Sequence, residues 1–489
     1  MSVRFVPVLC LAAFLAVSLC AQSIQSGTVV VTVHDPSGAV VSGADLVLRN
    51  PVTGYAQHVL SDPAGSFRFN NVPRNNYQLS ASSAGFATAT QTLAVNGSRP
   101  VMVDISLQLL EEATSVNVAA NGSMVEADTS AHQDADRSSF LTLPSFDPGA
   151  QLSQAITYST GAVAADANGF FHPLGDHAQT SFVIDGQSIS DQQSKVFSTQ
   201  IPANALQSME LITGSPDAQY GDKTSLVVNA ITRSGLGAAK TFGSVDTTWG
   251  SFGTWDGSAS LGVGNTKFGN FVVLNATDSG HFLDTPEFQP IHDRGNNESV
   301  FDRFDWQPDG KDSIHLDLFA ARNWFQVPNS YDQLSQDQKQ RVLTWNIAPG
   351  YQHTFNANTL LTINAYARRD QVDYYASANP FDDTPITASQ QRFLTNYGAN
   401  VDLAYQWHRH NLKVGTQIHE TPLVENFQFA VTDPEYNPVC INANGTLPSP
   451  LLAGVTNPAL CSSINPAYTA NPNLQPGIVP YDLTRGGSY

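Results

Sequence analysis

After Gly237 the chain alternates apolar and polar residues one by one, and this pattern constrains the fold more than any other feature of the sequence. Successive side chains of a β-strand point to opposite faces, so each such run predicts a strand with one apolar and one polar face. Clear examples are the runs 255–263, 361–368, 401–408 and 412–419. Because a soluble β-sandwich gives the same alternation, the connections between the strands must decide between a sandwich and a membrane barrel.

The connections alternate between short and long. Tight polar turns are expected at 264–267, 307–311, 356–359 and 408–411. The connections between them, 278–298, 323–341 and 370–391, are each about twenty residues long, which is rare in compact soluble domains. Short turns at one end and long loops at the other are typical of an outer-membrane β-barrel. Residues 236–489 are therefore expected to form part of an antiparallel transmembrane β-barrel.

Composition and motifs exclude several functions. The chain has 23 Lys and Arg residues against 42 Asp and Glu residues, and a net charge of -19 would repel a nucleic-acid backbone. We therefore expect no nucleic-acid partner. The sequence has no Cys/His grouping with metal-ligand spacing, no HExxH or HxxE arrangement and no Gly-x-Ser-x-Gly elbow. We accordingly expect no catalytic residue, no metal site, no cofactor and no enzymatic activity.

The first 21 residues are predicted to be a secretory signal peptide. Arg4 precedes an apolar run from Phe5 to Val17, and small residues near Ala21 suit a cleavage site. This run is too short to span a bilayer as a helix, which needs about 20 apolar residues. The mature chain is therefore expected to leave the cytoplasm.

The cysteines give one covalent prediction. Cys10 and Cys20 would be removed with the signal peptide, which leaves Cys440 and Cys461 as a pair in an oxidising compartment. The residues between them show no strand period, so we expect a disulfide that closes an external loop. The alternative is two free thiols in that loop.

Residues 24–109 alternate in shorter runs, separated by turns such as Asp35–Gly38 and Asp62–Gly65. About seven strands fit, and strands this short imply two packed antiparallel sheets. Gly27–Asp35, Asp62–Gly65 and Gly85-Phe86 closely resemble the carboxypeptidase regulatory-like domain. The resemblance implies a transthyretin-like or carbohydrate-binding-like β-sandwich, and this family has no catalytic residues of its own.

Residues 110–138 lose the apolar period and are predicted to be a linker. Residues 139–235 then mix short elements, with helices expected at 148–158 and 202–208 and strands at 180–184, 209–213 and 226–232. Four segments of this part resemble the plug domain of TonB-dependent outer-membrane receptors: Phe182–Gly186, Ile201–Gly214, Asp217–Gly221 and Val228–Gly235. The turn residues Asp185, Gly186, Tyr220 and Gly221 are the plug motif. A regulatory-like sandwich ahead of a plug is the arrangement of the Oar-like branch of that family.

The resemblance implies a mostly β chain with a transthyretin-like sandwich, a small α+β plug and part of an antiparallel transmembrane β-barrel. It also implies a site of energy coupling, which we expect in the linker at a loose match to the TonB box. These residues are Glu111, Glu112, Ala113, Thr114, Ser115, Val116, Asn117 and Val118. An extended segment there could add a strand to a partner's sheet.

The implied function is uptake of a scarce ligand through a plug-gated barrel in a Gram-negative-type outer membrane, with the N-terminal domain in the periplasm. The implied partners are a TonB-type inner-membrane energy-transducing protein, outer-membrane lipid, and an extracellular ligand that is a glycan, a peptide or a metal chelate. The alternative is a cell-surface carbohydrate-binding or adhesion protein that transports nothing. About nine strands fit after Gly237 against about 22 in such transporters, and 433–489 reads as loop, so we also expect an incomplete chain.

Overall fold

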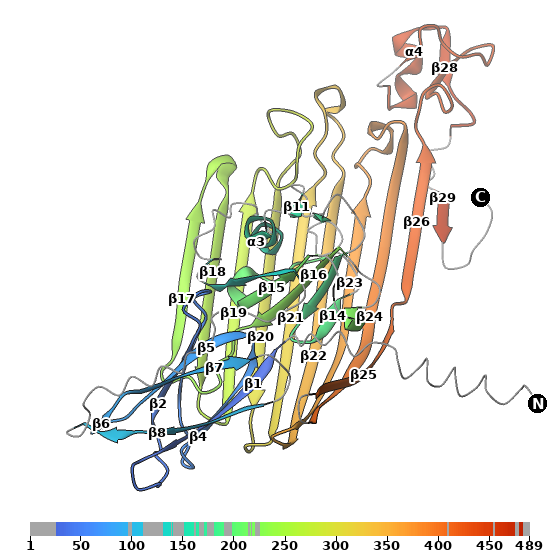
Figure 1. Cartoon of the computed structure of the whole chain (residues 1–489). Helices are drawn as coiled ribbons and strands as arrows, with labels where there is room; N and C mark the ends of the chain where they lie inside the picture. Colours follow the sequence, from blue (N-terminus) through green and yellow to red (C-terminus); the bar gives the residue numbers. More distant parts are fainter. Residues whose placement is uncertain are drawn as a thin grey trace, which may run out of the picture.

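Three parts follow one another along the chain, as Figure 1 shows for the computed structural model. It describes residues 26–95, 100–110, 131–137, 139, 151–160, 163–165, 171–173, 180–189, 198–213, 216, 218–220, 225–407, 410–452, 455–474 and 479–482. The predicted signal peptide 1–21, the predicted TonB contact Glu111–Val118, and Gly221 of the plug motif lie outside these ranges. No helix within them is long and apolar enough to cross a membrane.

The first part is a β-sandwich with a three-stranded sheet, β4-β1-β8, and a four-stranded sheet, β3-β2-β5-β7. Alternate residues such as Val29, Val31 and Val33 are fully buried between the sheets, as the alternation predicts. One detail differs from the prediction of purely antiparallel sheets, because β1 and β8 pair in parallel. The strands are β1 (Gly27–His34), β2 (Asp45–Arg49), β3 (Ala56–Leu60), β4 (Ser66–Val72), β5 (Asn75–Ser82), β6 (Phe86–Ala87), β7 (Ala89–Val95), β8 (Val101–Ser106) and β9 (Gln108–Leu109).

The second part, the plug, contains a five-stranded sheet of order β10-β15-β16-β13-β14. All seven residues of the central strand β16 are buried, as expected for a strand covered on both faces. The elements are β10 (His132–Asp136), α3 (Gln151–Thr160), β11 (Val163–Ala165), β12 (Phe171–Pro173), β13 (Thr180–Ile184), β14 (Gln187–Ile189), η1 (Ala203–Ala205), β15 (Leu206–Ile212), η2 (Ala218–Tyr220) and β16 (Leu226–Thr232).

Two plug elements differ from the sequence prediction. The helix predicted at 202–208 is a single 3-10 turn at 203–205, because the β-prone run of β15 already begins at Leu206. Strand β10 lies inside the predicted linker 110–138, so the plug sheet begins before residue 139. The sequence of β10, His-Gln-Asp-Ala-Asp, has no apolar period and forms an edge strand only through its pairing with β15.

The third part is an 11-stranded antiparallel sheet, hereafter the wall, of order β17-β18-β19-β20-β21-β22-β23-β24-β26-β29, in which β25 also pairs with β24. Figure 1 shows the plug lying against one face of the wall. The strands are β17 (Phe242–Trp249), β18 (Trp255–Gly264), β19 (Phe268–Ser279), β20 (Gly295–Trp306), β21 (Asp312–Gln326), β22 (Lys339–Asn356), β23 (Thr359–Tyr375), β24 (Ile386–Trp407), β25 (His410–Glu420), β26 (Leu423–Val431) and β29 (Val479–Asp482). Short 3-10 turns, η3 (Ser251–Gly253), η4 (Tyr331–Gln333) and η5 (Pro380–Asp382), lie in its connections.

Strands β25 and β26 are two halves of one long partner of β24. Tyr397 of β24 pairs with Glu420 and Leu394 pairs with Leu423, so the register continues without a shift across the gap. The gap falls at Thr421-Pro422, and proline has no amide hydrogen to donate to the ladder. The proline interrupts the hydrogen bonding while the register of the pairing with β24 stays the same.

The wall strands are longer than the sequence predicts, and the loops 280–294, 327–338 and 376–385 are correspondingly shorter than the predicted ones. The strands extend because their ends still pair with the neighbouring strand, as Lys339 does with Gln326 on one side and with Tyr375 on the other. The region 433–489 is also not loop throughout. It contains β27 (Cys440–Asn442), η6 (Pro458–Leu460), α4 (Cys461–Ile464) and β28 (Tyr468–Ala470), and its strand β29 pairs with β26.

Candidate functional site

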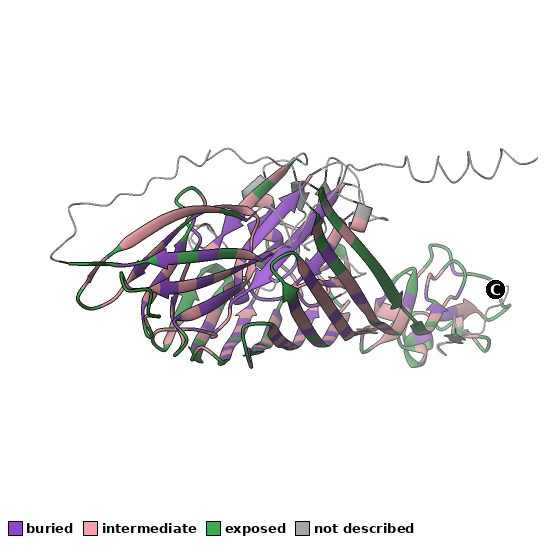
Figure 2. Cartoon of the chain, turned by 60° about the horizontal axis from the view of Figure 1, so that its bottom comes forward, coloured by how far each residue is buried: buried purple, intermediate pink, exposed green. Residues whose placement is uncertain are grey.

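The two faces of the wall have opposite chemistry. Large apolar side chains are exposed on the outer face, whereas polar and charged side chains are buried on the inner face, and Figure 2 shows this alternation along the strands. The outer set includes Leu261, Leu274, Val300, Phe304, Trp345, Ile347 and Leu403, and the inner set includes Asn275, Asn297, Arg303, Asp305, Thr344, Asn346, Arg368, Asp370 and Asn400. The predicted alternation of an apolar and a polar face holds along these strands, although β19, β20 and β21 also carry buried apolar residues on the inner face. A water-soluble sheet buries its apolar face, whereas an exposed apolar face opposite a polar one is typical of the strands of outer-membrane barrels.

Exposed aromatic side chains lie on the outer face next to the short turns. Phe268 and Trp306 stack with ring centroids 6.1 Å apart, and Tyr405 and Trp407 lie on β24 just before its turn. Tryptophan and tyrosine prefer the boundary between lipid and water, because one end of each ring system is apolar and the other is polar. This end of the wall has the composition of a membrane interface.

The plug reaches the wall through the Asp185-Gly186 turn between β13 and β14. Asp185 has φ +48° and Gly186 has φ +85°, the conformation of a two-residue hairpin turn that favours Asp-Gly. A Cβ atom at residue 186 would also overlap the Asn364 side chain of β23. Only glycine satisfies both the backbone conformation and the close approach, which explains the Asp-Gly sequence.

The Asp185 carboxylate enters a buried charge network with the wall. It lies 3.0 Å from the Arg303 guanidinium and accepts a 2.6 Å hydrogen bond from the Thr232 hydroxyl. Arg303 also donates to Asp305 at 2.9 Å, and Asp305 accepts a 2.6 Å bond from Ser234 of the plug. All of the charged side chains in this network are less than a tenth exposed. Removing one member would leave another charge buried without its partner, which costs more than the pair contributes.

A second polar contact lies further along the wall, where the plug meets β22 and β23. The hydroxyls of Thr199 and Thr344 are 2.9 Å apart, and Arg368 donates to the Thr199 carbonyl at 3.1 Å. Gln187 and Asn346 exchange two amide hydrogen bonds of 2.6 and 2.9 Å. These bonds join the plug to β22 and β23 through polar groups.

Toward β24 and β25 the contacts are polar as well. Asn400 donates to the Gly186 carbonyl at 2.9 Å, and Lys413 donates to the Gln219 amide oxygen at 2.7 Å. Toward β19, β20 and β21, by contrast, the hydrophobic core of the plug continues into Phe271, Val273, Phe301 and Phe319 of the wall. The plug is therefore attached to β19, β20 and β21 by apolar packing together with the Asp185–Arg303–Asp305 network, and to β22 to β25 by hydrogen bonds.

The sandwich also contacts the wall, at the end that carries the short turns. Arg68 of β4 donates to the carbonyls of Gly310 and Lys311 at 3.3 and 3.0 Å, and Asn70 donates to Ser313 at 2.8 Å. Gly237, with φ +73°, lies against the Phe67 ring so closely that a Cβ atom there would overlap it. The short-turn end of the wall is thus the end on which the sandwich rests.

The plug sheet contains one carboxylate with a strongly altered acidity. Glu210 of β15 lies directly opposite Asp134 of β10 and is 7% exposed. Burial, and then the neighbouring Asp134 charge, raises the pKa of Glu210 to about 7, although a hydrogen bond from Asn229 acts in the opposite direction. Like charges placed opposite each other on adjacent strands destabilise a sheet, so protonation of Glu210 relieves the repulsion.

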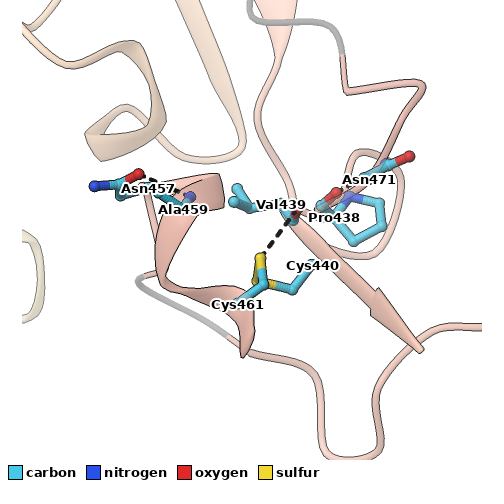
Figure 3. Close-up of a disulfide and its surroundings, with 7 residues drawn as sticks. All are labelled: Pro438, Val439, Cys440, Asn457, Ala459, Cys461 and Asn471. Carbon is cyan, nitrogen blue, oxygen red and sulfur yellow. Dashed lines mark hydrogen bonds between the residues drawn. A yellow bond between two sulfur atoms is a disulfide. The ribbon is translucent and has the colours of Figure 1, made fainter. Parts of the chain in front are cut away.

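The remaining predicted site residues lie in different places. Tyr220 is buried in the plug with Val183, Ile212 and Val227. Cys440 and Cys461 are joined by a disulfide, with Cα atoms 5.5 Å apart, in the region beyond β26 (Figure 3). Sequence reasoning did not identify Arg303 or Asp305, although charged residues inside an alternating strand are a recognisable signal. In the part of the chain that the structure describes, no group of three or more His, Cys, Asp or Glu residues is arranged to hold a metal ion.

A sheet with an apolar outer face and a polar inner face, and with a small α/β body against the inner face, is the architecture of plugged outer-membrane receptors. Residues 28–108 match the model of the carboxypeptidase regulatory-like domain. The chain is similar to the TonB-dependent transporter Oar of Myxococcus xanthus, with 26% identity over 276 residues, 53% of this chain and 26% of that protein. It thus spans about a quarter of the length of this curated relative. The matched relative is described as a transporter and not as an enzyme.

Three solved structures align with part of the chain. The unliganded ferric citrate transporter FecA aligns with a TM-score of 0.48 and 12% identity, over 62% of this chain and 49% of FecA. FpvA of P. aeruginosa, bound to a heterologous pyoverdine, aligns with a TM-score of 0.47 and 8% identity, over 61% and 43% of the two chains. The alcaligin receptor FauA of Bordetella pertussis aligns with a TM-score of 0.45 and 11% identity, over 64% and 50%.

Proposed function

We propose that this chain supplies the periplasmic domain, the plug and wall strands of a TonB-dependent outer-membrane receptor that takes up a scarce ligand. The observation that carries the proposal is the distribution of side chains on the wall: apolar residues lie on the outer face, polar residues lie on the inner face, and the plug is bonded to the polar face. A lumen lined with polar groups lets a polar ligand pass, whereas the plug closes it at rest. Opening then requires energy from outside the barrel.

The proposed orientation places the sandwich and the short turns in the periplasm and the longer loops outside the cell. Outer-membrane barrels have short periplasmic turns and longer extracellular loops. The sandwich rests on the short-turn end, and the linker that follows it returns to the plug at β10. A TonB-type protein of the inner membrane would reach the linker at Glu111–Val118 from the same side.

The proposed ligand class is a glycan, a peptide or a metal chelate, since the loops that would select it combine exposed apolar side chains such as Phe288 with charged ones such as Asp332. The alternative function, a surface carbohydrate-binding or adhesion protein, uses the same sandwich but needs no inner-membrane partner. The two functions therefore differ most sharply in whether the linker binds a TonB-type protein.

The test is binding of the full chain, isolated from outer membranes, to the purified periplasmic domain of a TonB-type protein. We expect the natural chain to bind and a chain lacking 111–118 to lose binding. The matched control replaces 119–126 with a Gly-Ser segment of equal length and should bind normally. A natural chain that reaches the outer membrane but does not bind, or a deletion without effect, would overturn the proposal, and glycan binding in that case would favour the alternative.

A further inference from the structure

A cavity of about 710 Å³ lies where the sandwich, the plug and the wall meet. Its lining comes from β3 and β4 of the sandwich, from the ends of β10 and β16 in the plug, and from β17 and β20 of the wall. It is separate from the loops in which a receptor of this kind would take its extracellular ligand. Its position at the short-turn end places it, in the proposed orientation, on the periplasmic side.

The lining of this junction cavity is basic in a chain that is acidic overall. The charged lining residues are Arg68, Arg137, Arg233, Lys240 and Arg303 against Asp136 and Asp305. The whole chain has 23 basic and 42 acidic residues, so an excess of basic residues in one cavity is opposite to the net charge of the chain. Asp305 is paired with Arg303, and Asp136 can balance only one of the remaining four cations. The lining therefore has a net positive charge.

Two of these arginines are buried with part of the guanidinium unpaired. Arg68 is 1% exposed and Arg233 is 9% exposed. Within the described residues, the Nη2 atom of Arg68 and the Nη1 atom of Arg233 are buried without a hydrogen-bond partner. Burial lowers the pKa of each to about 10, so both remain charged at neutral pH. A buried, charged donor without an acceptor is costly, and an oxyanion is the acceptor that guanidinium groups fit best.

Arg233 is the better placed of the two. Its guanidinium carbon lies 4.3 Å from the centre of the Phe271 ring and 5.0 Å from that of Phe242, which fixes its position by cation–π contact. The neighbouring Arg137 charge further lowers the pKa of Arg233, so the two guanidinium groups repel each other. A bound anion would neutralise that repulsion. Apolar side chains in the lining, including Phe67, Phe69 and Phe242, would accommodate an organic body attached to the anion.

We propose that the junction cavity binds a small organic anion, with a phosphate or carboxylate group on Arg233 and Arg137 and with Arg68 completing the site from the sandwich. The ligand would contact all three parts of the molecule at once. It would therefore favour the arrangement in which the sandwich rests on the wall. This function is independent of transport, because it requires neither a TonB-type partner nor an extracellular ligand.

Isothermal titration calorimetry of the full chain in detergent tests the proposal with defined probes. Phenyl phosphate and benzoate should bind saturably with one site per chain, whereas phenol, which has the ring without the anion, should not bind. Inorganic phosphate tests the arginines without the apolar lining. If inorganic phosphate binds more weakly than phenyl phosphate, the apolar lining contributes to binding. Absence of saturable binding by both organic anions at millimolar concentrations would overturn the proposal.

Variants locate the site. Arg233→Gln should weaken phenyl phosphate binding at least about tenfold, the usual effect of losing one charge-assisted hydrogen bond. Arg137→Gln, at a half-buried position, should have a similar effect and serves if Arg233→Gln does not fold. Arg49→Gln removes an exposed arginine of the same sandwich and should bind as the natural chain does. Unchanged binding in both folded cavity variants, or an equal loss in Arg49→Gln, would show that the anion binds elsewhere.

Discussion

At the scale of single residues, the contact between plug and wall depends on one carboxylate on a tight turn. Asp185 is placed by the left-handed backbone of the hairpin turn, and its oxygen atoms meet Arg303 and Thr232. The pairing crosses from one part of the fold to another over more than a hundred residues of sequence. Sequence patterns predict the Asp-Gly turn from local backbone requirements, but they do not predict which wall strand supplies the arginine.

Replacing Asp185 with Asn tests the contribution of the charge. Asparagine tolerates the same backbone conformation, so the turn should remain while Arg303 keeps Asp305 and Asp317 and loses one of the three carboxylates within 4.0 Å. We expect the free energy of unfolding to fall by about 2 to 3 kcal/mol, because a buried charge then lacks part of its compensation. Urea unfolding in detergent measures this change. Asp332→Asn, at an exposed loop position, should change the stability by less than about 0.5 kcal/mol.

The raised pKa of Glu210 predicts how the stability of the plug changes with pH. Because folding raises its pKa from an ordinary 4.5 to about 7, the folded plug binds a proton more tightly than the unfolded chain. The resulting stabilisation is complete below pH about 4.5 and is lost as the pH rises to about 7. Glu210→Gln should therefore remove this pH dependence and stabilise the plug at neutral pH.

Unfolding measured at pH about 5 and about 8 gives the test, and the natural chain should lose up to about 3 kcal/mol between them through this group. His132 and Arg74 also act on Glu210, and both lower its pKa. Glu435→Gln, in an exposed turn, is the control and should leave the pH profile unchanged. A Glu210→Gln profile that matches that of the natural chain would contradict the prediction.

At the scale of elements, the alternation in the sequence predicts the wall strands well, because side-chain direction in a strand is fixed by geometry. The leading example is 361–368, where Thr362, Asn364 and Arg368 face inward as the pattern requires. Strand β10 and the full lengths of the wall strands could not be predicted from the sequence. Their polar residues become part of strands only because a neighbouring strand or the plug satisfies them, which is a tertiary effect.

The region beyond β26 is held together by a contact between residues far apart in the sequence. Cys440 and Cys461, separated by 21 positions, lie in a small cluster with Val439. Closing a loop of this length stabilises a fold by about 3 kcal/mol. Maleimide labelling of the unreduced, denatured mature chain should modify neither cysteine. Labelling after reduction should modify both, and modification of both without reductant would contradict the disulfide.

At the scale of the whole molecule, the exposed apolar face of the wall predicts where charge is tolerated. Ile347 lies near the middle of β22 on the outer face and is 46% exposed. An arginine near the middle of a bilayer costs about 2 to 4 kcal/mol in an outer-membrane barrel. Ile347→Arg should therefore reduce the amount of chain recovered in the outer membrane.

Leu334→Arg makes the same change at an exposed loop position beside η4 and serves as the control. Quantitative blotting of outer-membrane fractions compares the two variants at equal expression. We expect recovery of Leu334→Arg to equal that of the natural chain. Equal recovery of both variants would mean that the outer face of β22 does not meet lipid.

Because the plug is attached differently on its two sides, water can replace its contacts with the wall more easily on one side than on the other. Water can replace the hydrogen bonds to β22, β23, β24 and β25 one for one, but it cannot replace the packing of Phe271, Phe301 and Phe319. On β19 to β21 this packing adds to the Asp185–Arg303 network, so solvent should enter first along β22 to β25 when the plug loosens, while the side facing β19 to β21 stays closed. A passage formed in this way would be bounded by Asn346, Arg368 and Asn400, and the first molecules to line it would be water.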